Sequence, residues 1–266
     1  MSTPLTPLIT LTTDFGRDSP YVAAMKGVIL SHHPGARIVD VTHSIPPQDI
    51  RNAAWVLEEV APHWPDGTIH VVVVDPGVGT ARKMIYAAWK SACYLAPDNG
   101  VLSRLARRSP PTTIVALESR QYWLPTVSNT FHGRDILAPV AARLSLGLDP
   151  RALGPPLAKL VEIPWSEVSV MPGKIQGTVR SIDSFGNLVT DIAADKLADV
   201  PTDPEQVRVR CDEHETQGLF RTYADQPQMT LVAIIGSSGY LELAIVGDSA
   251  QMMLGVRTGA PVSVIW

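Results

Sequence analysis

The chain has little of several features that mark large classes of protein. Only two of its 266 residues are cysteine, Cys93 and Cys211, and they lie far apart in the sequence. We therefore expect free thiols in a reducing cytoplasm rather than a disulfide framework. No apolar stretch approaches the roughly 20 residues that span a bilayer, so we expect no membrane-spanning segment. The opening residues have no basic region ahead of an apolar core, which is not the pattern of a signal peptide.

A strong charge of one sign and the usual ligand spacings are also missing. The formal net charge is −4, from 22 Lys and Arg against 26 Asp and Glu. This balance gives no electrostatic reason to expect nucleic acid or an anionic membrane as a partner. No CxxC or HxxxH pair is present, so we expect no metal site. The pair Gly77 and Gly79 lacks the third glycine of a dinucleotide fingerprint and the Gly-Lys-Ser/Thr of a phosphate-binding loop, which favours a tight turn.

Up to about residue 150 the sequence alternates strand-like and helical segments. The strand-like runs cover residues 8–13, 36–43, 69–74, 87–95, 113–117 and 123–127. The helical segments cover residues 19–30, 49–60 and 133–146, the last with Pro139 as an expected kink. The alternation predicts an α/β fold class for residues 1–160, with a mostly parallel sheet between two layers of helices.

A stretch rich in proline and glycine at about 148–175 separates this part from the rest. Beyond it the helical periodicity nearly vanishes, and strand-like runs surround short turns. These runs cover residues 174–183, 187–192, 229–235, 240–246 and 260–266. Short strands joined by turns predict a second, small all-β barrel domain, residues 161–266.

Polar residues stand where three of the predicted strands end. Asp14 follows the first run, His43 ends the second, and Asp75 follows the valine-rich third run. That third run is typical of a parallel strand buried on both faces, and ligands of such sheets bind beyond the carboxyl ends of the strands. A single aspartate at a strand end is as readily explained by support of a turn. Two of them favour a binding site.

Arg82 and His132 are the other candidates for chemistry. The turn after Asp75 can fold Arg82 back onto the carboxylate as a charge-assisted pair, although such a pair alone is usually structural. His132 stands directly before Gly133 at the predicted start of a helix, where backbone N–H groups favour a developing negative charge. A lone histidine in that position is more often a hydrogen-bonded structural residue, so both interpretations stay open.

Eight short motifs, taken together and in order, resemble one family. Those of the first domain are TTDFG (12–16), YxxxxKG (21–27), VDVTHxIPP (39–47), VDPGVGTxR (74–82), APDNG (96–100) and TFHGRD (130–135). Those of the second are FGN (185–187) and SSGY (237–240). Together they are similar to the S-adenosylmethionine hydroxide adenosyltransferase family, whose halogenating relatives are the fluorinase and chlorinase. The resemblance covers nearly the whole chain.

The resemblance implies an enzyme that attacks the ribose C5′ of S-adenosylmethionine with a water-derived hydroxide and releases adenosine and L-methionine. It implies no cofactor, and a homotrimer with each site between one subunit's N-terminal domain and its neighbour's C-terminal domain. It assigns the catalytic set to Asp75, Arg82 and His132. The substrate-binding positions that it implies are Asp14, for the ribose diol, and Gly133, Asp183, Phe185, Asn187, Ser237, Glu242 and Ile245.

Two alternatives remain at this point. A halogenase would place chloride or fluoride where the hydroxide goes, but an ionised Asp75 beside that position would repel an anion. A non-catalytic sensor of S-adenosylmethionine or adenosine would explain Asp14 and Asn187 equally well. It would give no reason to bring Asp75, Arg82 and His132 together.

Overall fold

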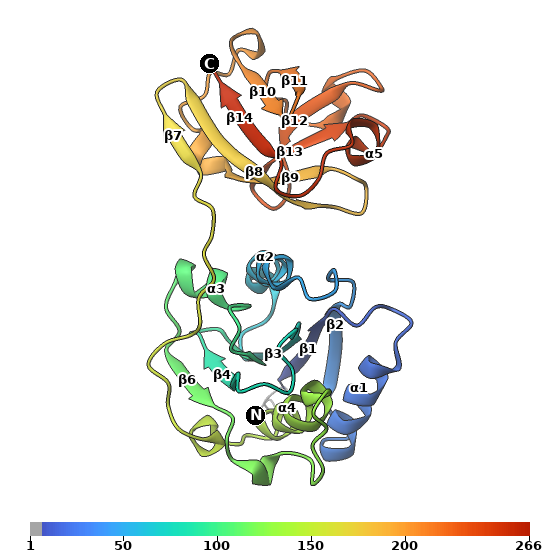
Figure 1. Ribbon diagram of the computed structural model, residues 1–266, viewed down its shortest axis with the longest axis vertical. Coiled ribbons are helices and arrows are strands. Elements are labelled where there is room, and N and C mark those ends of the chain that lie inside the picture. The colour runs from blue at the N-terminus through green and yellow to red at the C-terminus, as the bar shows by residue number, and fades with distance from the viewer. Residues whose placement is uncertain (1–6) are drawn as a thin grey trace, which may run out of the picture. The chain divides into compact units, whose positions relative to one another are not determined.

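Two compact units make up the chain, Met1–Ile163 and Pro164–Trp266, and the computed structural model describes residues 7–266 (Figure 1). The opening segment, from which we expect no signal peptide, lies outside the described residues for its first six positions. Across residues 7–266, no helix combines the length and the apolar character needed to cross a membrane.

A six-stranded sheet with the order β2-β1-β3-β5-β4-β6 forms the centre of the first unit. Its strands are β1 (Leu8–Thr13), β2 (Arg37–Thr42), β3 (Thr68–Val73), β4 (Met84–Ala88), β5 (Ala92–Pro97) and β6 (Thr113–Ala116). β1 pairs in parallel with β2 and β3, and β3 pairs in parallel with β5. β4 pairs antiparallel with both β5 and β6, so it alone among these six strands runs in the opposite direction. The prediction of a mostly parallel sheet is therefore confirmed.

Helices cover both faces of this sheet (Figure 1). Val71 and Val73 of β3 share one cluster with Met25 of a helix, whereas Val72 shares another with Leu57 of a different helix. β3 is thus buried on both faces, as its valine run predicts. The helices are α1 (Pro20–His32) and α4 (Ala138–Ser145) on one face, and α2 (Ile50–Val60) and α3 (Ser103–Arg108) on the other. Single turns are η1 (Ala61–His63), η2 (Arg120–Tyr122) and η4 (Pro150–Leu153).

Two predicted strands of this unit were wrong. The run 87–95 is not one strand but the hairpin that joins β4 to β5, closed by the Trp89 N–H donating to the Ala92 carbonyl at 2.8 Å. The run 123–127 forms no strand, because Pro125 lacks an N–H and the Leu124 N–H donates instead to the Asp135 carbonyl at 2.9 Å.

The predicted helix 133–146 begins with a wide π-helical turn, η3 (Gly133–Leu137), and continues as α4. Pro139 explains the register of this turn. In a regular α-helix the residue at 139 would donate to the carbonyl of Asp135, and proline has no N–H to donate. The bond from Leu124 satisfies that carbonyl instead, which ties the loop before η3 to the helix.

An antiparallel, nearly closed barrel forms the second unit, with the strand order β11-β10-β14-β8-β9-β13-β12 and β7 beside β8. The side chain of Thr216 on β11 donates to the Leu231 carbonyl on β12 at 2.6 Å and so links the two edges. The strands are β7 (Ser169–Met171), β8 (Lys174–Ile182), β9 (Leu188–Ala193), β10 (Arg208–Cys211), β11 (His214–Gln217), β12 (Leu231–Ile235), β13 (Tyr240–Ile245) and β14 (Pro261–Ile265). The helical turns are η5 (Ala194–Leu197), η6 (Pro204–Gln206), η7 (Tyr223–Asp225) and α5 (Ala250–Leu254). Cys93 and Cys211 are free thiols, as expected.

Candidate active site

The carboxyl ends of β1, β2 and β3 lie side by side at one edge of the first sheet. Because these three strands are parallel neighbours, Asp14, His43 and Asp75 come to that edge together. The side chain of His43 is bonded through Nδ1 to Thr13 Oγ1 at 3.0 Å, which fixes the ring against the end of β1. The sequence pattern predicted this shared edge, and the pairing of the strands confirms it.

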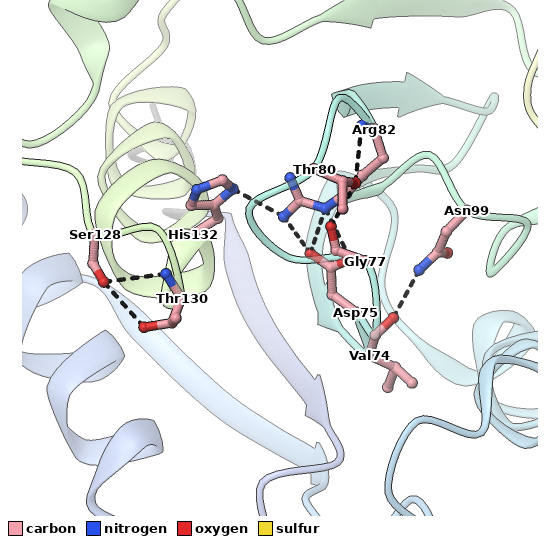
Figure 2. A network of polar contacts seen from close by, with 9 residues as sticks. All are labelled: Val74, Asp75, Gly77, Thr80, Arg82, Asn99, Ser128, Thr130 and His132. Carbon is pink, nitrogen blue, oxygen red and sulfur yellow. Dashed lines mark hydrogen bonds and ion pairs between the residues drawn. The ribbon is translucent and has the colours of Figure 1, made fainter.

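Asp75 and Arg82 form the ion pair that the sequence suggested (Figure 2). Arg82 Nε donates to both carboxylate oxygens at 2.9 Å, and Arg82 Nη2 also contacts Oδ2. The two side chains are only 5% and 10% exposed, so water screens this pair little. The turn between them depends on Gly79, which has a φ of +82° and lies against the Asn129 carbonyl. A Cβ at this position would lie 2.7 Å from that oxygen, so glycine is required.

His132 joins this pair through Arg82. Arg82 Nη2 donates to His132 Nδ1 at 2.8 Å, so one guanidinium holds both the carboxylate and the imidazole (Figure 2). Arginine only donates hydrogen bonds, so Nδ1 carries a lone pair and the ring proton sits on Nε2. Burial and the adjacent Arg82 lower the pKa of His132, against the opposing effects of Asp75, Asp135 and a hydrogen bond to the Ser128 backbone. The lowered pKa and the hydrogen bond from Arg82 both favour the neutral form of the ring.

A buried carboxylate holds the loop that leads to His132. Asp135 is fully buried, pairs with Arg134 at 2.6 Å and accepts a hydrogen bond from the Ser128 N–H at 2.7 Å. The Ser128 backbone is among the groups that raise the pKa of His132 against the lowering effects of burial and Arg82, so Asp135 acts on His132 in part through Ser128. Sequence reasoning missed Ser128, since nothing in its local pattern marks it.

Gly133 lies at the first position of η3, directly after His132, as predicted. A Cβ there would lie 3.0 Å from a methyl group of Val73 and 3.3 Å from the sulfur of Met25. The glycine therefore lets the start of this helix pack closely on β3 and α1. This contact brings the residue after His132 against Val73, two positions before Asp75.

Asp14 lies at the same sheet edge but belongs to a separate set of contacts. Its Oδ2 accepts the Gln48 N–H at 2.8 Å, and the carboxylate is half-buried. Gln48 has a φ of +67°, an uncommon conformation for a residue other than glycine. The structure thus gives Asp14 a fixed position with one oxygen committed to the backbone.

A cavity of about 620 Å³ lies against Arg82 and His132. Its wall is formed by the start of β4, by Ile136 of η3 and by the segment that follows β6. The charged side chains in this wall are Arg82, Lys83, Glu118 and Arg120. Neither Asp14 nor Asp75 lines it. In the sheet order, β4 and β6 lie on one side of β3, and β1 lies on the other. Arg82 and His132 therefore line this cavity, whereas Asp14 belongs to the strand on the other side of β3.

The candidates of the second unit gather around the turn between β8 and β9. Asp183 accepts hydrogen bonds from the N–H groups of Phe185 and Asn187, at 2.9 and 2.8 Å, and from the Asn187 side chain at 2.9 Å. The same Asn187 amide contacts the Tyr223 hydroxyl at 3.4 Å, and this hydroxyl lies 3.5 Å from Glu242 Oε1. Tyr223 is a member of this cluster that the sequence did not single out.

The remaining candidates of this unit lie in different surroundings. Phe185 is 78% exposed at the tip of the β8–β9 turn, and Ser237 is exposed in the turn between β12 and β13. Ile245 is 7% exposed and packs in the barrel core, with Leu243 and Leu188 in the same cluster. Across residues 7–266, no group of three or more His, Cys, Asp or Glu side chains is placed to hold a metal ion.

The fold and the site define a protein with an α/β unit, a β-barrel unit and a buried Asp–Arg–His cluster at a sheet edge. Residues 9–154 match the family model described as the SAM hydroxide adenosyltransferase N-terminal domain, and residues 177–263 match that of the C-terminal domain. The chain belongs to the SAM hydroxide adenosyltransferase family.

Individual relatives agree with this assignment. An (R)-S-adenosyl-L-methionine hydrolase of Thermus thermophilus is 38% identical over 264 residues, with 95% of this chain and 97% of the relative covered. The crystal structure of an uncharacterized conserved protein from Thermotoga maritima superposes with a TM-score of 0.92 at 35% identity, over 97% of this chain and 100% of that one. A fluorinase of an Actinoplanes species is more distant, at 27% identity over 97% of both chains.

Proposed function

We propose that this chain is an S-adenosyl-L-methionine hydrolase that attacks the ribose C5′ with water and releases adenosine and L-methionine. Membership of the SAM hydroxide adenosyltransferase family and the hydrolase names of its relatives support this activity. The observation that carries the proposal is the guanidinium of Arg82, which joins Asp75 and His132 into one buried cluster.

The reaction asks most of the nucleophile. The C5′–S bond breaks with its electron pair going to sulfur, so a neutral thioether leaves and no general acid is needed. Water is a weak nucleophile at neutral pH and must be oriented in line with that bond while it loses a proton. A positioned acid–base group contributes about 10²–10⁴-fold to such a step. Correct alignment of water and C5′ adds a separate proximity effect.

We assign the proton to Asp75 rather than to His132. Arg82 donates to His132 Nδ1 and the ring proton sits on Nε2, so the imidazole has no free lone pair for water. A carboxylate has about four acceptor sites, of which Arg82 uses only part. The O–C5′ bond then forms as the water proton passes to Asp75 and on to solvent. His132 keeps the guanidinium in place while this happens.

Asp14 and the second unit would hold the rest of the substrate. The Asp14 oxygen that is not committed to Gln48 is free to accept hydrogen bonds from ribose hydroxyls. Asp183, Phe185, Asn187, Ser237, Glu242 and Ile245 remain our candidates for contacts with adenine and methionine, together with Gly133 of the first unit. For Ile245, burial in the barrel core makes this role indirect.

We also expect the following of the domains, the assembly and the substrate. The functional domains are residues 1–160 and 161–266, and the enzyme uses no cofactor. It works as a homotrimer in the cytoplasm. Each site joins the N-terminal domain of one subunit to the C-terminal domain of the next. S-adenosyl-L-methionine is the expected partner, with neither nucleic acid nor membrane. The name of the Thermus relative adds a finer expectation, namely preference for the (R) epimer at sulfur.

The halogenase alternative fits the site less well. A halide nucleophile has no proton to lose, so it would give no use to Asp75, the carboxylate that we assign as the acceptor of the water proton. The hydrolase relative is also closer in sequence than the fluorinase, at 38% against 27% identity. Incubation with S-adenosylmethionine and chloride separates the two activities, because a halogenase gives 5′-chloro-5′-deoxyadenosine as its main product and a hydrolase gives adenosine.

Product analysis tests the proposal directly. The purified protein is incubated with each sulfonium epimer separately, and adenosine and methionine are measured by chromatography. We expect equal amounts of adenosine and methionine. Asp75→Ala should abolish turnover and His132→Ala should lower it strongly, while adenosine binding, measured by calorimetry, stays largely intact in both variants. Lys83→Ala is the matched control, since Lys83 lies next to Arg82 but pairs with Glu118 at 2.9 Å. Binding without turnover in the unaltered protein would establish the sensor alternative instead.

A further inference from the structure

The loop Ala96–Gly100, one of the motifs in the sequence, has no role in the chemistry above. β5 lies between β3 and β4 in the sheet, so this loop begins between the end of β3 and the start of β4. The segment that joins β3 to β4 contains both Asp75 and Arg82. The loop after β5 is therefore placed between the two ends of the segment that forms the ion pair.

Two hydrogen bonds connect the loop to those two ends. The Asn99 side chain donates through Nδ2 to the Val74 carbonyl at 2.9 Å, directly before Asp75 (Figure 2). The Asp98 N–H donates to the Lys83 carbonyl at 2.9 Å, directly after Arg82. Asp98 and Asn99 thus hold Val74 and Lys83, the residues directly before and after the Asp75–Arg82 segment.

The sheet itself does not make the first of these bonds. The parallel pairing of β3 with β5 ends at Val71 and Leu95, and Pro97 at the end of β5 has no N–H to donate. Val74 is fully buried, and a buried carbonyl without a partner is costly. The Asn99 amide supplies the donor that the strand lacks.

Asn99 is itself held in place. Its Oδ1 accepts the Val101 N–H at 3.2 Å, which closes the turn. Asp98 Oδ1 accepts the Val161 N–H at 2.8 Å, and Gly100, with a φ of +96°, lies against the side chain of Ile163. The loop is therefore fixed to the chain on both sides and has little freedom to follow a displaced β3.

We propose that Asn99 is a positioning residue for the hydrolysis: its amide, by holding the Val74 carbonyl, sets the direction in which Asp75 meets Arg82 and so the alignment of the whole cluster. The expected effect on hydrolysis rests on the proposed function, whereas the hydrogen bond from Asn99 to Val74 does not. A displacement of about 1 Å in a group that aligns a nucleophile costs about 10²-fold in rate. Loss of the Asn99 amide is expected to cost a similar factor in kcat.

Two variants and one control test the role. Asn99→Ala removes both side-chain bonds, and Asn99→Asp keeps the acceptor for Val101 while removing the donor to Val74. Asn52→Ala, in α2, is the matched control, and circular dichroism checks that each variant is folded. We expect kcat to fall about 10²-fold in both Asn99 variants with KM for S-adenosylmethionine changed less than about threefold. The control should keep the kcat of the unaltered protein.

A second measurement does not depend on activity. The titration of His132 is followed by NMR, with His132→Gln used to assign its signal. Because Arg82 helps to hold the pKa of His132 low, a loosened cluster raises that pKa in the folded Asn99 variants. An unchanged titration, or an unchanged kcat, overturns the positioning role. If the unaltered protein has no hydrolase activity but the titration shifts as expected, the proposed function fails and the geometric role of Asn99 stands.

Discussion

Replacing Arg82 by lysine tests how the cluster works, because lysine keeps the positive charge and loses the shape. The guanidinium binds Asp75 through two nitrogens and His132 through one of them. A lysine ammonium is a single donor point on a flexible chain and cannot hold both partners in the same geometry. The variant thus separates the charge beside Asp75 from the bridge to His132.

The size of the effect follows from the contacts. A hydrogen bond that involves a charged group contributes about 1.5–3 kcal/mol, and the burial of this pair leaves that value little reduced by solvent. Each 1.36 kcal/mol of lost transition-state stabilisation is a factor of ten in rate. In Arg82→Lys the hydrogen bond to His132 and one of the two nitrogen contacts with Asp75 are lost. We therefore expect kcat to fall by about 10²-fold.

The assay is adenosine formation at saturating S-adenosylmethionine, with adenosine affinity measured separately by calorimetry. Lys83→Arg serves as the control, because it changes a neighbouring cation that is 47% exposed. A double variant with His132→Gln adds a sharper test: if Arg82 and His132 act as one unit, the double variant is little slower than either single one. A kcat within threefold of the unaltered protein in Arg82→Lys would refute the bridging role.

The other predictions concern stability and binding. Burial lowers the pKa of His70 to about 4 from an unfolded value near 6.5. The free energy of unfolding should therefore be highest above pH 6.5 and about 2 kcal/mol lower at pH 5, because the unfolded state then binds a proton that the folded state does not. Urea unfolding at pH 5 and above pH 6.5 checks this, and the same loss in His70→Gln would contradict it. Gly79→Ala should lower Tm and turnover more than Gly67→Ala, because both glycines have a φ of +82° but only at Gly79 does a Cβ meet another residue within 4 Å; equal effects would show that the contact is unimportant. Asp14→Ala should raise KM about 10²-fold with a smaller change in kcat, and steady-state kinetics showing the reverse would exclude a ribose-binding role.

The sequence carried enough information to place one edge of the site. The valine run before Asp75 predicts a strand buried on both faces, and the same logic places Asp14 at the end of a parallel neighbour. Arg82 follows Asp75 by seven positions, a spacing short enough to suggest that a turn joins them. These inferences succeed because they depend on local patterns and on the shared direction of parallel strands.

Other parts of the site depend on the order of the strands, which local patterns do not determine. Asn99 reaches Val74 only because β5 lies between β3 and β4, and the two residues are 25 positions apart. The local pattern marks His132 as a candidate with two open interpretations, but its grouping with Arg82, 50 residues away, needed the family resemblance. Short strands such as β11, with the sequence HETQ, contain no apolar pattern to detect and are held by their neighbours in the barrel.

The origin of one oxygen atom in the products distinguishes hydrolysis at C5′ from every other outcome. Hydrolysis in water enriched in oxygen-18, followed by mass spectrometry of both products, reports where the new bond forms. We predict one labelled oxygen in the 5′-hydroxyl of adenosine and none in methionine, with the rate of labelling reduced in Arg82→Lys and Asn99→Ala. Adenosine without the label, or a substrate that is bound and recovered unchanged, would contradict attack by water at C5′.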